Sequence, residues 1–483
     1  MPIRKHSLKN IHFVGIGGIG MSGIAEILIN LGFNVQGSDL SNNQLVIRLR
    51  KLGAKIFNNH SLENISKAQV VVVSTAIKND NPEVIEARRL KIPVVRRCEM
   101  LAEIMHLKMG IAISGSHGKT STTSLVASIL DEAGLDPTVI NGGIINNYGS
   151  NARLGTGDFV VAEADESDGS FTKLPATIAV VTNIDPEHMD YFKTFDSLKN
   201  EFVKFIENIP FYGLAVVCVD SEAASEVCKR ITDRRIITYG LSDNAQIRAK
   251  NISMEENGMI FDLYFDDFTE KYDEVYENIV KIPTIIKNIH LSMFGEHNVY
   301  NALAAIAVAM EIGIKKEHIL KALSEFKGVK RRFSILSKHN GVTLVDDYAH
   351  HPEEMKRVVS TAKSMAKGNL YSIIQPHRYT RLQSLFDDFA SCALGSSEVF
   401  VTPVYEANEL PIDGINSKTL VLKMKELGIN ACFVESVEDL YENLIKKINT
   451  GDYVVSMGAG SITSWCSSLK EKFESTVKFK KSI

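Results

Sequence analysis

Short apolar runs rich in β-branched residues alternate with longer stretches of helical periodicity along most of the chain. In the first hundred residues, the strand candidates are residues 11–17, 33–39, 54–57, 70–76 and 93–97. The helix candidates between them are residues 21–31, 43–52 and 82–90. Such alternation is typical of a parallel sheet with crossover helices. We therefore predict an α/β domain that ends near residue 108.

The alternation resumes with a strand at 110–116 and a helix at 119–133, and polar loops then follow the strands at 159–165 and 178–185. Residues 245–290 differ, because they contain short alternating strands separated by turns. The segment 297–313 is apolar around most of a helical surface, which indicates a buried helix. We predict that this second α/β domain spans residues 109–328 and includes a small antiparallel segment.

A third group of apolar strands follows the segment GVKRRF at 328–333, which we interpret as a linker. The strand candidates are residues 342–348, 369–376, 398–404 and 453–460, with helical stretches between them. A chain of 483 residues corresponds to about three domains at roughly 150 residues each. We therefore predict three α/β domains, 1–108, 109–328 and 329–483. The outer two are expected to be Rossmann-like, and the central one a P-loop-type ATPase domain.

The composition is that of an average globular protein, with 45% hydrophobic and 23% charged residues. A balance of 54 basic against 58 acidic residues gives no electrostatic signal for nucleic acid or an anionic membrane, so small-molecule partners are expected. The six cysteines form no CxxC pair, and no segment reads as a signal peptide or a membrane span. We expect a cytoplasmic protein with free thiols.

The sequence GIGGIG at 15–20 lies between a predicted strand and a predicted helix. Its glycines permit a close approach of the backbone to a diphosphate, and the helix N-terminus supplies oriented N–H groups. Asp39 lies at the distance downstream where an acid that binds ribose is expected. The pattern fits a nicotinamide dinucleotide, another diphosphate ligand, or a tight turn that binds nothing.

A second phosphate-binding pattern, GSHGKTST at 115–122, also separates a strand from a helix. Ile113 stands where the usual phosphate loop has its first glycine, but the chemistry is retained. Backbone N–H groups can surround phosphates, Lys119 can reach the β and γ oxygens, and Thr120 can coordinate Mg²⁺. The sequence therefore predicts a nucleoside triphosphate site.

Two acidic clusters follow strands downstream of this loop. They are EADESD at 163–168 and NIDPEHMD at 183–190. Acidic runs are often only solvated loops, but two in succession after apolar strands favour a metal site. Mg²⁺ prefers carboxylate oxygens, so Glu163 is an ordinary candidate ligand and His188 a less ordinary one.

Polar clusters also follow strands of the third domain, in DDYAHHP at 346–352 and QPHRYTR at 375–381. His350 and His351 could simply mark a helix entrance before a proline. Arg378 and Arg381 are three residues apart on a predicted helical turn, so both could face one cleft and bind carboxylate or phosphate. With no nucleophile arrangement evident, the chemistry expected is phosphoryl transfer.

Taken together, these segments resemble the Mur ligase family, over nearly the whole chain from residue 11 to residue 460. The resemblance rests on the ordered set GIGGIGMSGIAEIL, GSHGKTSTT, EADESDGSF, TNIDPEHMD, GEHNVYNALAA, GVKRRF, DDYAHHP and QPHRYTR. It implies that the first domain binds the uridine diphosphate of a UDP-sugar rather than a nicotinamide cofactor.

The resemblance is to the alanine-adding branch of the family and implies an ATP-dependent acid–amino-acid ligase of peptidoglycan precursor synthesis. The γ-phosphate of ATP would pass to the carboxylate of UDP-N-acetylmuramate. The amine of L-alanine would then attack the acyl phosphate, leaving an amide, ADP and phosphate. The implied partners are these small molecules and Mg²⁺, and the protein would be a monomer or a homodimer.

The resemblance also implies roles for individual residues. Catalytic roles fall to Lys119, Glu163, His188, Arg378 and Arg381. The metal ligands would be Thr120, Glu163 and His188. ATP contacts would be Gly115, Ser116, His117, Gly118, Lys119, Thr120, Ser121, His297, Asn298, Arg332 and Asp347. UDP-sugar contacts would be Gly15, Gly17, Gly18, Asp39, Ser74, Thr75, Ala76 and Ile77. The amino acid would contact Tyr348, His350, Arg378 and Arg381.

Three alternative functions are weighed against this hypothesis. A ligase that recycles a preformed murein tripeptide shares HGKT, but GIGGIGMSGIAEI favours the biosynthetic enzyme. A nicotinamide-dependent oxidoreductase would explain GIGGIG and Asp39 but neither GSHGKT nor the two acidic clusters. A non-catalytic nucleotide sensor is disfavoured because Lys119, Glu163 and His188 are all present.

Overall fold

The computed structural model describes residues 8–74, 76–265, 285–407 and 409–476. These residues form two compact units, residues 1–329 and 330–483, and they contain three separate sheets. The boundary between the units falls inside the predicted linker at 328–333. The first unit holds the first and second sheets, and the second unit holds the third.

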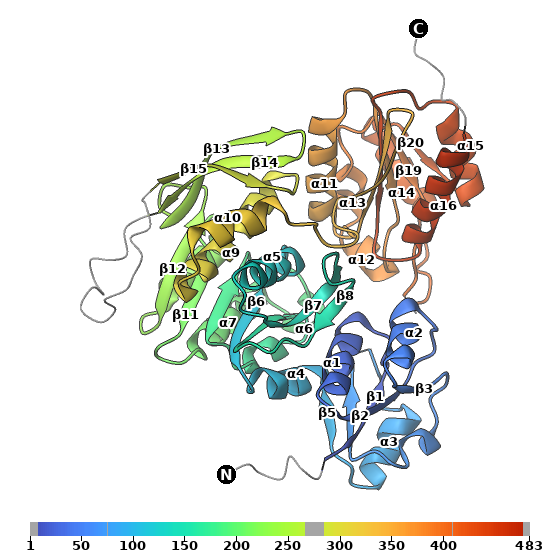
Figure 1. Ribbon diagram of the computed structural model, residues 1–483. Helices are drawn as coiled ribbons and strands as arrows, with labels where there is room; N and C mark the ends of the chain where they lie inside the picture. Colours follow the sequence, from blue (N-terminus) through green and yellow to red (C-terminus); the bar gives the residue numbers. More distant parts are fainter. Residues whose placement is uncertain (1–7, 75, 266–284, 408, 477–483) are drawn as a thin grey trace. The chain divides into compact units, whose positions relative to one another are not determined.

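The first sheet has five parallel strands in the order β3-β2-β1-β4-β5 (Figure 1), which confirms the predicted Rossmann-like arrangement. The strands are β1 (Asn10–Val14), β2 (Asn34–Ser38), β3 (Lys55–Phe57), β4 (Val70–Val73) and β5 (Val94–Arg96). The helices are α1 (Ile19–Asn30), α2 (Gln44–Lys51), η1 (Leu62–Ile65), α3 (Pro82–Arg89) and α4 (Arg97–Met105). The apolar pattern did not predict α4.

Alternation along β1 assigns its residues to the two faces of this sheet. Ile11 and Phe13 pack into the same apolar cluster as the buried side chains of α1, whereas Val14 packs with Ala87 of α3. His12 shares a face with Val14, because side chains of a strand alternate between faces. The start of α3 is fixed by the Asn81 side chain, which accepts the N–H of Glu83, and by proline at the first helical position.

The second sheet has ten strands in the order β15-β14-β13-β12-β11-β10-β6-β9-β7-β8. The strands are β6 (Met109–Ser114), β7 (Thr138–Ile145), β8 (Ser150–Arg153), β9 (Phe159–Glu163), β10 (Ile178–Val181), β11 (Leu214–Cys218), β12 (Arg235–Gly240), β13 (Ile247–Glu255), β14 (Gly258–Phe265) and β15 (Ile285–Leu291). The last three pair in antiparallel fashion, which confirms the predicted antiparallel segment over its described residues. Residues 266–284 of that segment lie outside the described residues.

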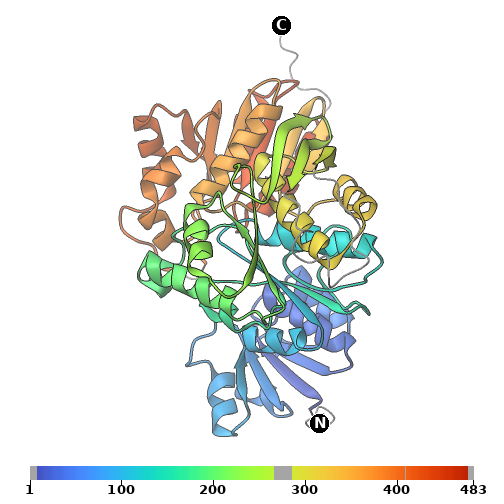
Figure 2. The same ribbon diagram turned by 90° about the vertical axis from the view of Figure 1, so that its left-hand side faces the viewer.

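Helices cover both faces of the parallel part of this sheet. The buried side chains of α5 (Lys119–Glu132), α9 (Glu296–Ile312) and α10 (Lys316–Ser324) pack on one face, together with Ile111 and Ile113 of β6. Those of α7 (Phe195–Glu207) and α8 (Glu222–Arg230) pack on the other, together with Ala112. Figure 2 shows α7 and α8 in green and α9 and α10 in yellow, separated by strands. The predicted buried helix at 297–313 is α9.

The third sheet has six strands in the order β16-β17-β21-β18-β19-β20. They are β16 (Ser334–His339), β17 (Val342–Asp347), β18 (Leu370–Ile374), β19 (Glu398–Val401), β20 (Ala431–Phe433) and β21 (Tyr453–Met457). Its helices are α11 (Pro352–Met365), α12 (Tyr379–Ser384), α13 (Phe386–Ser391), α14 (Ser417–Glu426), α15 (Val437–Ile445) and α16 (Ile462–Ser475). All four predicted strands are present, and the edge strands β16 and β20 are additional.

Within the first unit, the helix that follows GIGGIG packs directly against the second sheet. The Asn151 side chain of β8 donates a hydrogen bond of 2.6 Å to the carbonyl of Ile19. A side chain on Gly23 of α1 would approach the same asparagine, with its Cβ 3.0 Å from the amide nitrogen. Glycine at this position therefore permits the close packing of α1 on β8.

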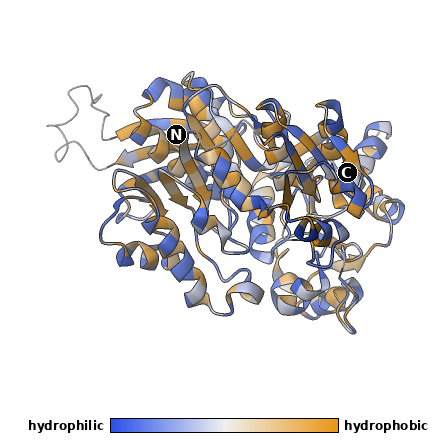
Figure 3. Cartoon of the chain, turned by 90° about the horizontal axis from the view of Figure 1, so that it is seen from below, coloured by the Kyte–Doolittle hydropathy of each residue, from blue (hydrophilic) through white to orange (hydrophobic). Residues whose placement is uncertain are grey.

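Hydrophobic residues are frequent in the strands, whereas most helices contain both hydrophobic and hydrophilic residues, as the colours of Figure 3 show. None of the helices within the described residues is both long and apolar enough to cross a membrane. The six cysteines are free thiols, as predicted.

Candidate functional site

The N–H groups of the first glycine-rich loop donate hydrogen bonds to residues at the end of β2. The carbonyl oxygen of Ser38 accepts the N–H groups of Gly15 (2.8 Å) and Ile16 (3.1 Å). The next residue, Asp39, accepts the N–H of Gly17 at 2.7 Å through its carboxylate. A Cβ on Gly17 would lie 2.8 Å from that same carboxylate, so the turn requires glycine there. The dipeptide Ser38–Asp39 thus shapes the loop.

The sequence-predicted contacts of the UDP-sugar meet at this edge of the first sheet. Gly18 caps α1, and this glycine has no side chain to bond to the open N–H groups of that helix end. The Ser74 hydroxyl and the Ile77 side chain lie 3.5 Å from the point where a Cβ on Gly15 would stand. The arrangement suits a diphosphate at the helix N-terminus. Thr75 lies outside the described residues.

The second loop, between β6 and α5, is fixed by the residues that follow β10. The Asn183 side chain accepts the N–H of His117 (2.8 Å) and donates to its carbonyl (3.0 Å). Thr182 also donates to that carbonyl. The Ser116 hydroxyl accepts the N–H of Asp185 at 2.8 Å. The loop is therefore shaped before any ligand binds, which favours backbone recognition of phosphate.

Gly115 is expected to be the least replaceable residue of this loop, because its φ is +131° and a Cβ there would lie 2.1 Å from the Thr182 hydroxyl. For Gly115→Ala we expect a loss of about 2–4 kcal/mol in the free energy of unfolding and at least tenfold weaker ATP binding. Denaturant unfolding and calorimetry with ATP measure both. Gly134→Ala, with φ of +75° and open space around it, is the matched control. Equal losses for the two variants would contradict the steric argument.

Lys119 begins α5 and points back into the loop. Its ammonium group donates to the carbonyls of Gly115 (2.5 Å) and Ser116 (3.0 Å) and pairs with the buried carboxylate of Glu166 at 3.0 Å. Burial opposes the charged form of Lys119, but the neighbouring carboxylates, Glu166 foremost, raise its pKa above the usual value. A permanent cation therefore stands where the loop would hold phosphates.

Glu163 and Thr120 place two oxygen atoms that could bind a metal ion beside this lysine. The Thr120 hydroxyl donates to the Glu163 carboxylate at 2.9 Å, and the N–H of Gly142 donates to the same oxygen at 2.7 Å. A Cβ on Gly142 would lie 2.5 Å from that carboxylate, so glycine leaves the space that Glu163 occupies. Hydroxyl and carboxylate oxygens are the ligand types that Mg²⁺ prefers.

His188 lies with two further carboxylates near Lys119. One ligand atom each from Glu166, Glu187 and His188 falls within 4.8 Å of the others. His188 has a left-handed backbone conformation, with φ of +57°, and precedes α6 (Met189–Phe192). Burial raises the pKa of Glu166 to about 7, against the charge of Lys119. Of the predicted metal ligands, Glu163 bonds to Thr120, the residue next to Lys119 in the chain. His188 lies 3.7 Å from Glu166, which pairs with Lys119.

The predicted ATP contacts His297 and Asn298 lie in the first turn of α9, and a chain of amide side chains connects them to the phosphate loop. Asn301 accepts the hydroxyl of Thr122 at 3.2 Å and donates to the side chain of Asn298 at 2.9 Å. Asn298 in turn lies 3.1 Å from a ring nitrogen of His297. A Cβ on Gly118 would lie 2.5 Å from Asn301, so α9 packs directly on the loop.

In the second unit, Asp347 ends β17 and ties the start of the unit to the strand. Its carboxylate accepts the N–H groups of Phe333 (2.6 Å) and Ala349 (2.7 Å). Burial raises the pKa of Asp347 to about 6, and the nearby charge of Arg332 acts in the opposite direction. The Arg332 guanidinium lies 5.5 Å from the centre of the Tyr348 ring. The predicted site residues Arg332, Asp347 and Tyr348 are therefore neighbours.

An aromatic cluster continues from Tyr348. His350 packs edge-to-face on Tyr348 at 5.2 Å and on His377 at 5.7 Å, and His377 stacks on Tyr405 at 5.3 Å. Burial lowers the pKa of His350 to about 4 and that of His377 to about 3, so both rings are neutral at neutral pH. Arg381 lies 3.5 Å from His377.

Arg378 and Arg381 both belong to the first turn of α12, but Arg378 is the N-cap and has a non-helical backbone with a φ of +70°. The N–H of Arg378 donates to the carbonyl of Tyr405 at 2.8 Å, and its carbonyl accepts the N–H of Leu382 at 3.1 Å. Arg381 lies inside α12. That both side chains face one cleft stays a prediction.

Some residues of the phosphate-loop site and of the aromatic cluster around His350 were not predicted. Glu166 is three positions after Glu163 in the acidic segment 163–168, and His377 stands in the segment 375–381, so local motifs contained both signals. Asn183 also stands in a quoted segment, 183–190, and Asn301 in the segment GEHNVYNALAA, but their contacts with the loop cross 66 and 179 positions. Tyr405 lies in none of the quoted motifs.

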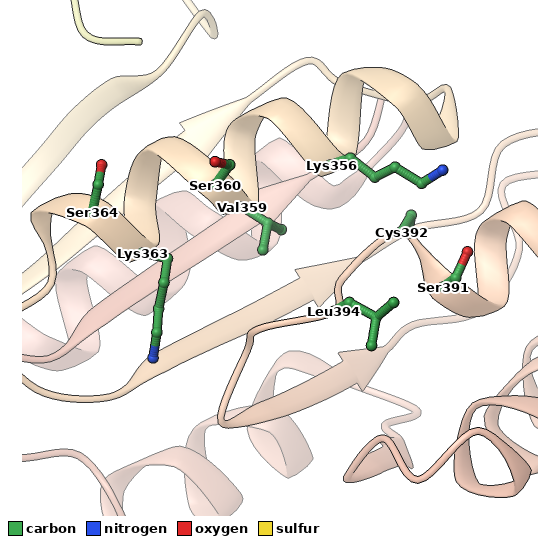
Figure 4. A pocket seen from close by; sticks show the side chains of 8 residues that line it. All are labelled: Lys356, Val359, Ser360, Lys363, Ser364, Ser391, Cys392 and Leu394. Atoms are coloured by element: carbon green, nitrogen blue, oxygen red, sulfur yellow. The ribbon is translucent and has the colours of Figure 1, made fainter.

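A surface hollow of about 440 Å³ lies elsewhere in the second unit, between α11 and the end of α13 (Figure 4). Figure 4 shows Lys356, Val359 and Lys363 along one side of α11, opposite Cys392 and Leu394. The Lys356 ammonium pairs with Glu353 on the same helix. This hollow contains none of the predicted site residues.

Comparisons with known protein families match most of the chain, in three consecutive segments. The model described as Mur ligase family, catalytic domain, matches residues 10–109. The Mur ligase middle domain matches residues 113–309, and the Mur ligase, glutamate ligase domain matches residues 331–460.

Relatives and solved structures agree with these family matches. UDP-N-acetylmuramate–L-alanine ligase of Parvibaculum lavamentivorans is 52% identical over 465 residues, covering 96% of this chain and 93% of the relative. The enzyme of the same name from a Bradyrhizobium species is 51% identical and covers 96% and 97%. The crystal structure of a UDP-N-acetylmuramate-alanine ligase from Thermotoga maritima has a TM-score of 0.80 at 30% identity and covers 96% and 99%. A murein peptide ligase from Psychrobacter arcticus, at 23% identity, covers 97% and 99% with a TM-score of 0.69 and shares the fold.

Proposed function

Because this chain belongs to the Mur ligase family, we propose that it joins L-alanine to the carboxylate of UDP-N-acetylmuramate, using ATP and releasing ADP and phosphate. The product is a precursor of peptidoglycan. The observation that carries the proposal is the phosphate loop, with Lys119 and Glu163 in contact with its residues, in a chain about half identical to L-alanine ligases over 96% of its length.

The chemistry requires activation of a poor electrophile. A carboxylate resists attack by an amine, and transfer of the γ-phosphate converts it to an acyl phosphate with a good leaving group. Such transfer depends on positioning and on neutralising charge. Lys119, already held as a cation by the loop carbonyls, would neutralise the transferred phosphate. The amine of alanine then attacks the acyl carbon, and phosphate leaves.

Thr120, Glu163 and His188 are the residues that we propose to hold Mg²⁺. The Thr120 hydroxyl and the Glu163 carboxylate suit the ion and lie 2.9 Å apart beside the loop, whereas the structure groups His188 with Glu166 and Glu187. Bound there, Mg²⁺ would neutralise charge on the phosphate oxygens. Glu163 is preorganised for this role by the N–H of Gly142.

We further propose that each ligand takes most of its contacts from one part of the chain. UDP-N-acetylmuramate would bind within residues 1–108, through the GIGGIG loop, Asp39 and residues 74–77. ATP would bind the loop at 115–121 within residues 109–328, with contacts from His297, Asn298, Arg332 and Asp347. L-Alanine would bind within residues 329–483, near Tyr348, His350, Arg378 and Arg381. We place the protein in the cytoplasm, as a monomer or a homodimer.

The alternatives explain less of the molecule. A nicotinamide-dependent oxidoreductase has no use for Lys119 and Glu163 beside a second phosphate loop. A tripeptide-recycling ligase would use the same ATP chemistry, so the choice between it and an alanine ligase depends on the amino substrate.

The test is an assay of ADP and phosphate release. We expect release only when ATP, Mg²⁺, UDP-N-acetylmuramate and L-alanine are all present, because the acyl phosphate forms on the muramate and is consumed by alanine. Each component is omitted in turn, and glycine, L-serine and the murein tripeptide replace alanine. Formation of AMP and pyrophosphate, or turnover without the muramate, would contradict the proposal. Faster turnover with the tripeptide would favour the recycling ligase.

A further inference from the structure

A buried carboxylate in the first sheet's domain is not used by any of the proposed contacts. Glu83, at the start of α3, has a fully buried side chain. One oxygen accepts the Ser38 hydroxyl at 2.5 Å and lies 2.9 Å from a ring nitrogen of His60. The other accepts the side-chain N–H of Asn64 at 2.7 Å and lies 3.5 Å from His12. We name these five residues the Glu83 network.

The network is built for a charged carboxylate. Burial raises the pKa of Glu83, but the nearby His12 ring and the bonds with Ser38, Asn64 and His60 outweigh burial and lower it to about 2. Neither lysine nor arginine pairs with it among the described residues, where its ion-pair partners are His12 and His60. A fully buried charge without a strong cation costs free energy, which suggests that the charge serves a purpose beyond packing.

The partners of Glu83 come from separate elements. His12 lies on β1, Ser38 ends β2, and Asn64 belongs to η1. Asn64 is itself held, since its side chain donates to the carbonyl of Asn59 and its own carbonyl accepts the Gln36 side chain. The network therefore fixes the end of β2 against β1 and α3 from inside the domain.

Ser38 connects this network to the first glycine-rich loop. Its hydroxyl is held by Glu83, while its carbonyl accepts the N–H groups of Gly15 and Ile16. The adjoining Asp39 accepts the N–H of Gly17. Space beneath is tight, because a Cβ on Gly37 would lie 2.6 Å from the carbonyl of Phe13. A shift of Ser38 would thus move the backbone N–H groups of the whole loop.

We propose that Glu83 is a positioning residue for the UDP end of the substrate, acting through Ser38 on the GIGGIG loop without touching the ligand. This inference rests on the proposed function, in which the loop binds the diphosphate. A residue of this kind affects affinity for one substrate and leaves the ATP site, on the second sheet, unchanged.

The test compares Glu83→Gln and Ser38→Ala with the full-length protein. Glutamine keeps the shape of the side chain and removes its charge, and alanine removes the hydroxyl through which Glu83 acts. We expect each variant to bind UDP-N-acetylmuramate about tenfold more weakly in calorimetry, with the KM for ATP within about twofold of its original value. Glu86→Gln, which breaks only a pair with Arg89 at the surface of the same helix, is the matched control.

A double-variant cycle separates positioning from general stability. If Glu83 acts through Ser38, Glu83→Gln in a Ser38→Ala background should weaken binding by no more than about twofold further. Thermal unfolding is measured for every variant. Equal binding by Glu83→Gln and Glu86→Gln, or parallel losses in ATP and UDP-substrate affinity, would overturn the inference. Failure of the unaltered protein to bind UDP-N-acetylmuramate would instead contradict the proposed function.

Discussion

Replacing Lys119 by alanine should abolish turnover while leaving the binding of UDP-N-acetylmuramate intact. We expect kcat to fall by about 10³-fold or more, because phosphoryl transfer depends on neutralising the charge of the transferred group. Lys119 is a cation held within the phosphate loop, at 2.5 Å and 3.0 Å from two loop carbonyls. The GIGGIG loop belongs to a different sheet. Release of ADP measures turnover, and calorimetry measures binding of the UDP substrate.

The variant has a predictable side effect that the experiment must remove. Alanine removes the cation beside the buried carboxylate of Glu166, whose pKa is already raised to about 7, so this carboxyl takes up a proton and its lost bond costs about 1–3 kcal/mol of stability. The double variant Lys119→Ala/Glu166→Gln should recover the melting temperature and remain inactive. Lys173→Ala, at an exposed position of the same unit, serves as the control. Turnover in the double variant, or loss of UDP-substrate binding in a folded Lys119→Ala protein, would contradict the assignment.

The α/β architecture follows from the apolar pattern because most strands of these sheets are covered by helices on both faces. Runs such as Val70–Val73 are continuous apolar segments, which is the pattern of buried parallel strands. Two of the elements that the pattern did not predict, β20 and β16, are short or partly exposed, whereas α4 is a nine-residue helix with a largely buried surface. β20 has three residues, and β16 is a half-exposed antiparallel edge strand with Ser337 and Lys338. Such segments have too few buried positions to show a period.

The phosphate loops could be predicted because their chemistry is local. Glycines, a lysine and a threonine at fixed spacing between a strand and a helix specify the loop at 115–120, and the structure places Lys119 and Thr120 at the start of α5. The residues that complete the site are distant in sequence. Asn301 reaches the loop across 179 positions to contact Thr122, and the Glu83 network joins four elements. Such contacts depend on how the elements pack, which periodicity does not encode.

The roles of the acidic residues also needed the structure. Asp39 and Asp347 stand where ligand contacts were predicted, and in the structure both carboxylates accept backbone N–H groups that shape the surrounding loops. Each carboxylate has further lone pairs, so a ligand contact remains compatible with these bonds. A sequence motif identifies such a residue but does not show how many of its acceptor sites already bind backbone N–H groups.

Replacing Glu163 by glutamine should weaken Mg²⁺ binding and lower kcat by about 10²-fold. Glutamine has the same shape, so its carbonyl oxygen can still accept the Thr120 hydroxyl and the N–H of Gly142. Only the negative charge is lost, and a neutral amide is a poorer ligand for Mg²⁺. We therefore expect half-maximal activity at a Mg²⁺ concentration about tenfold higher, measured by titrating the ion at saturating ATP.

Glu132→Gln is the matched control for this experiment, because Glu132 ends the same helix, α5, and pairs with Lys321 at the surface. It should leave both kcat and the Mg²⁺ dependence within about twofold of the unaltered protein, as expected for an exposed pair. If Glu163→Gln kept the original Mg²⁺ dependence, the carboxylate would serve only to hold Thr120 and Gly142, and the proposed metal site would lose its central ligand. A raised Mg²⁺ requirement with unchanged thermal unfolding would instead separate metal binding from the architecture of the loop.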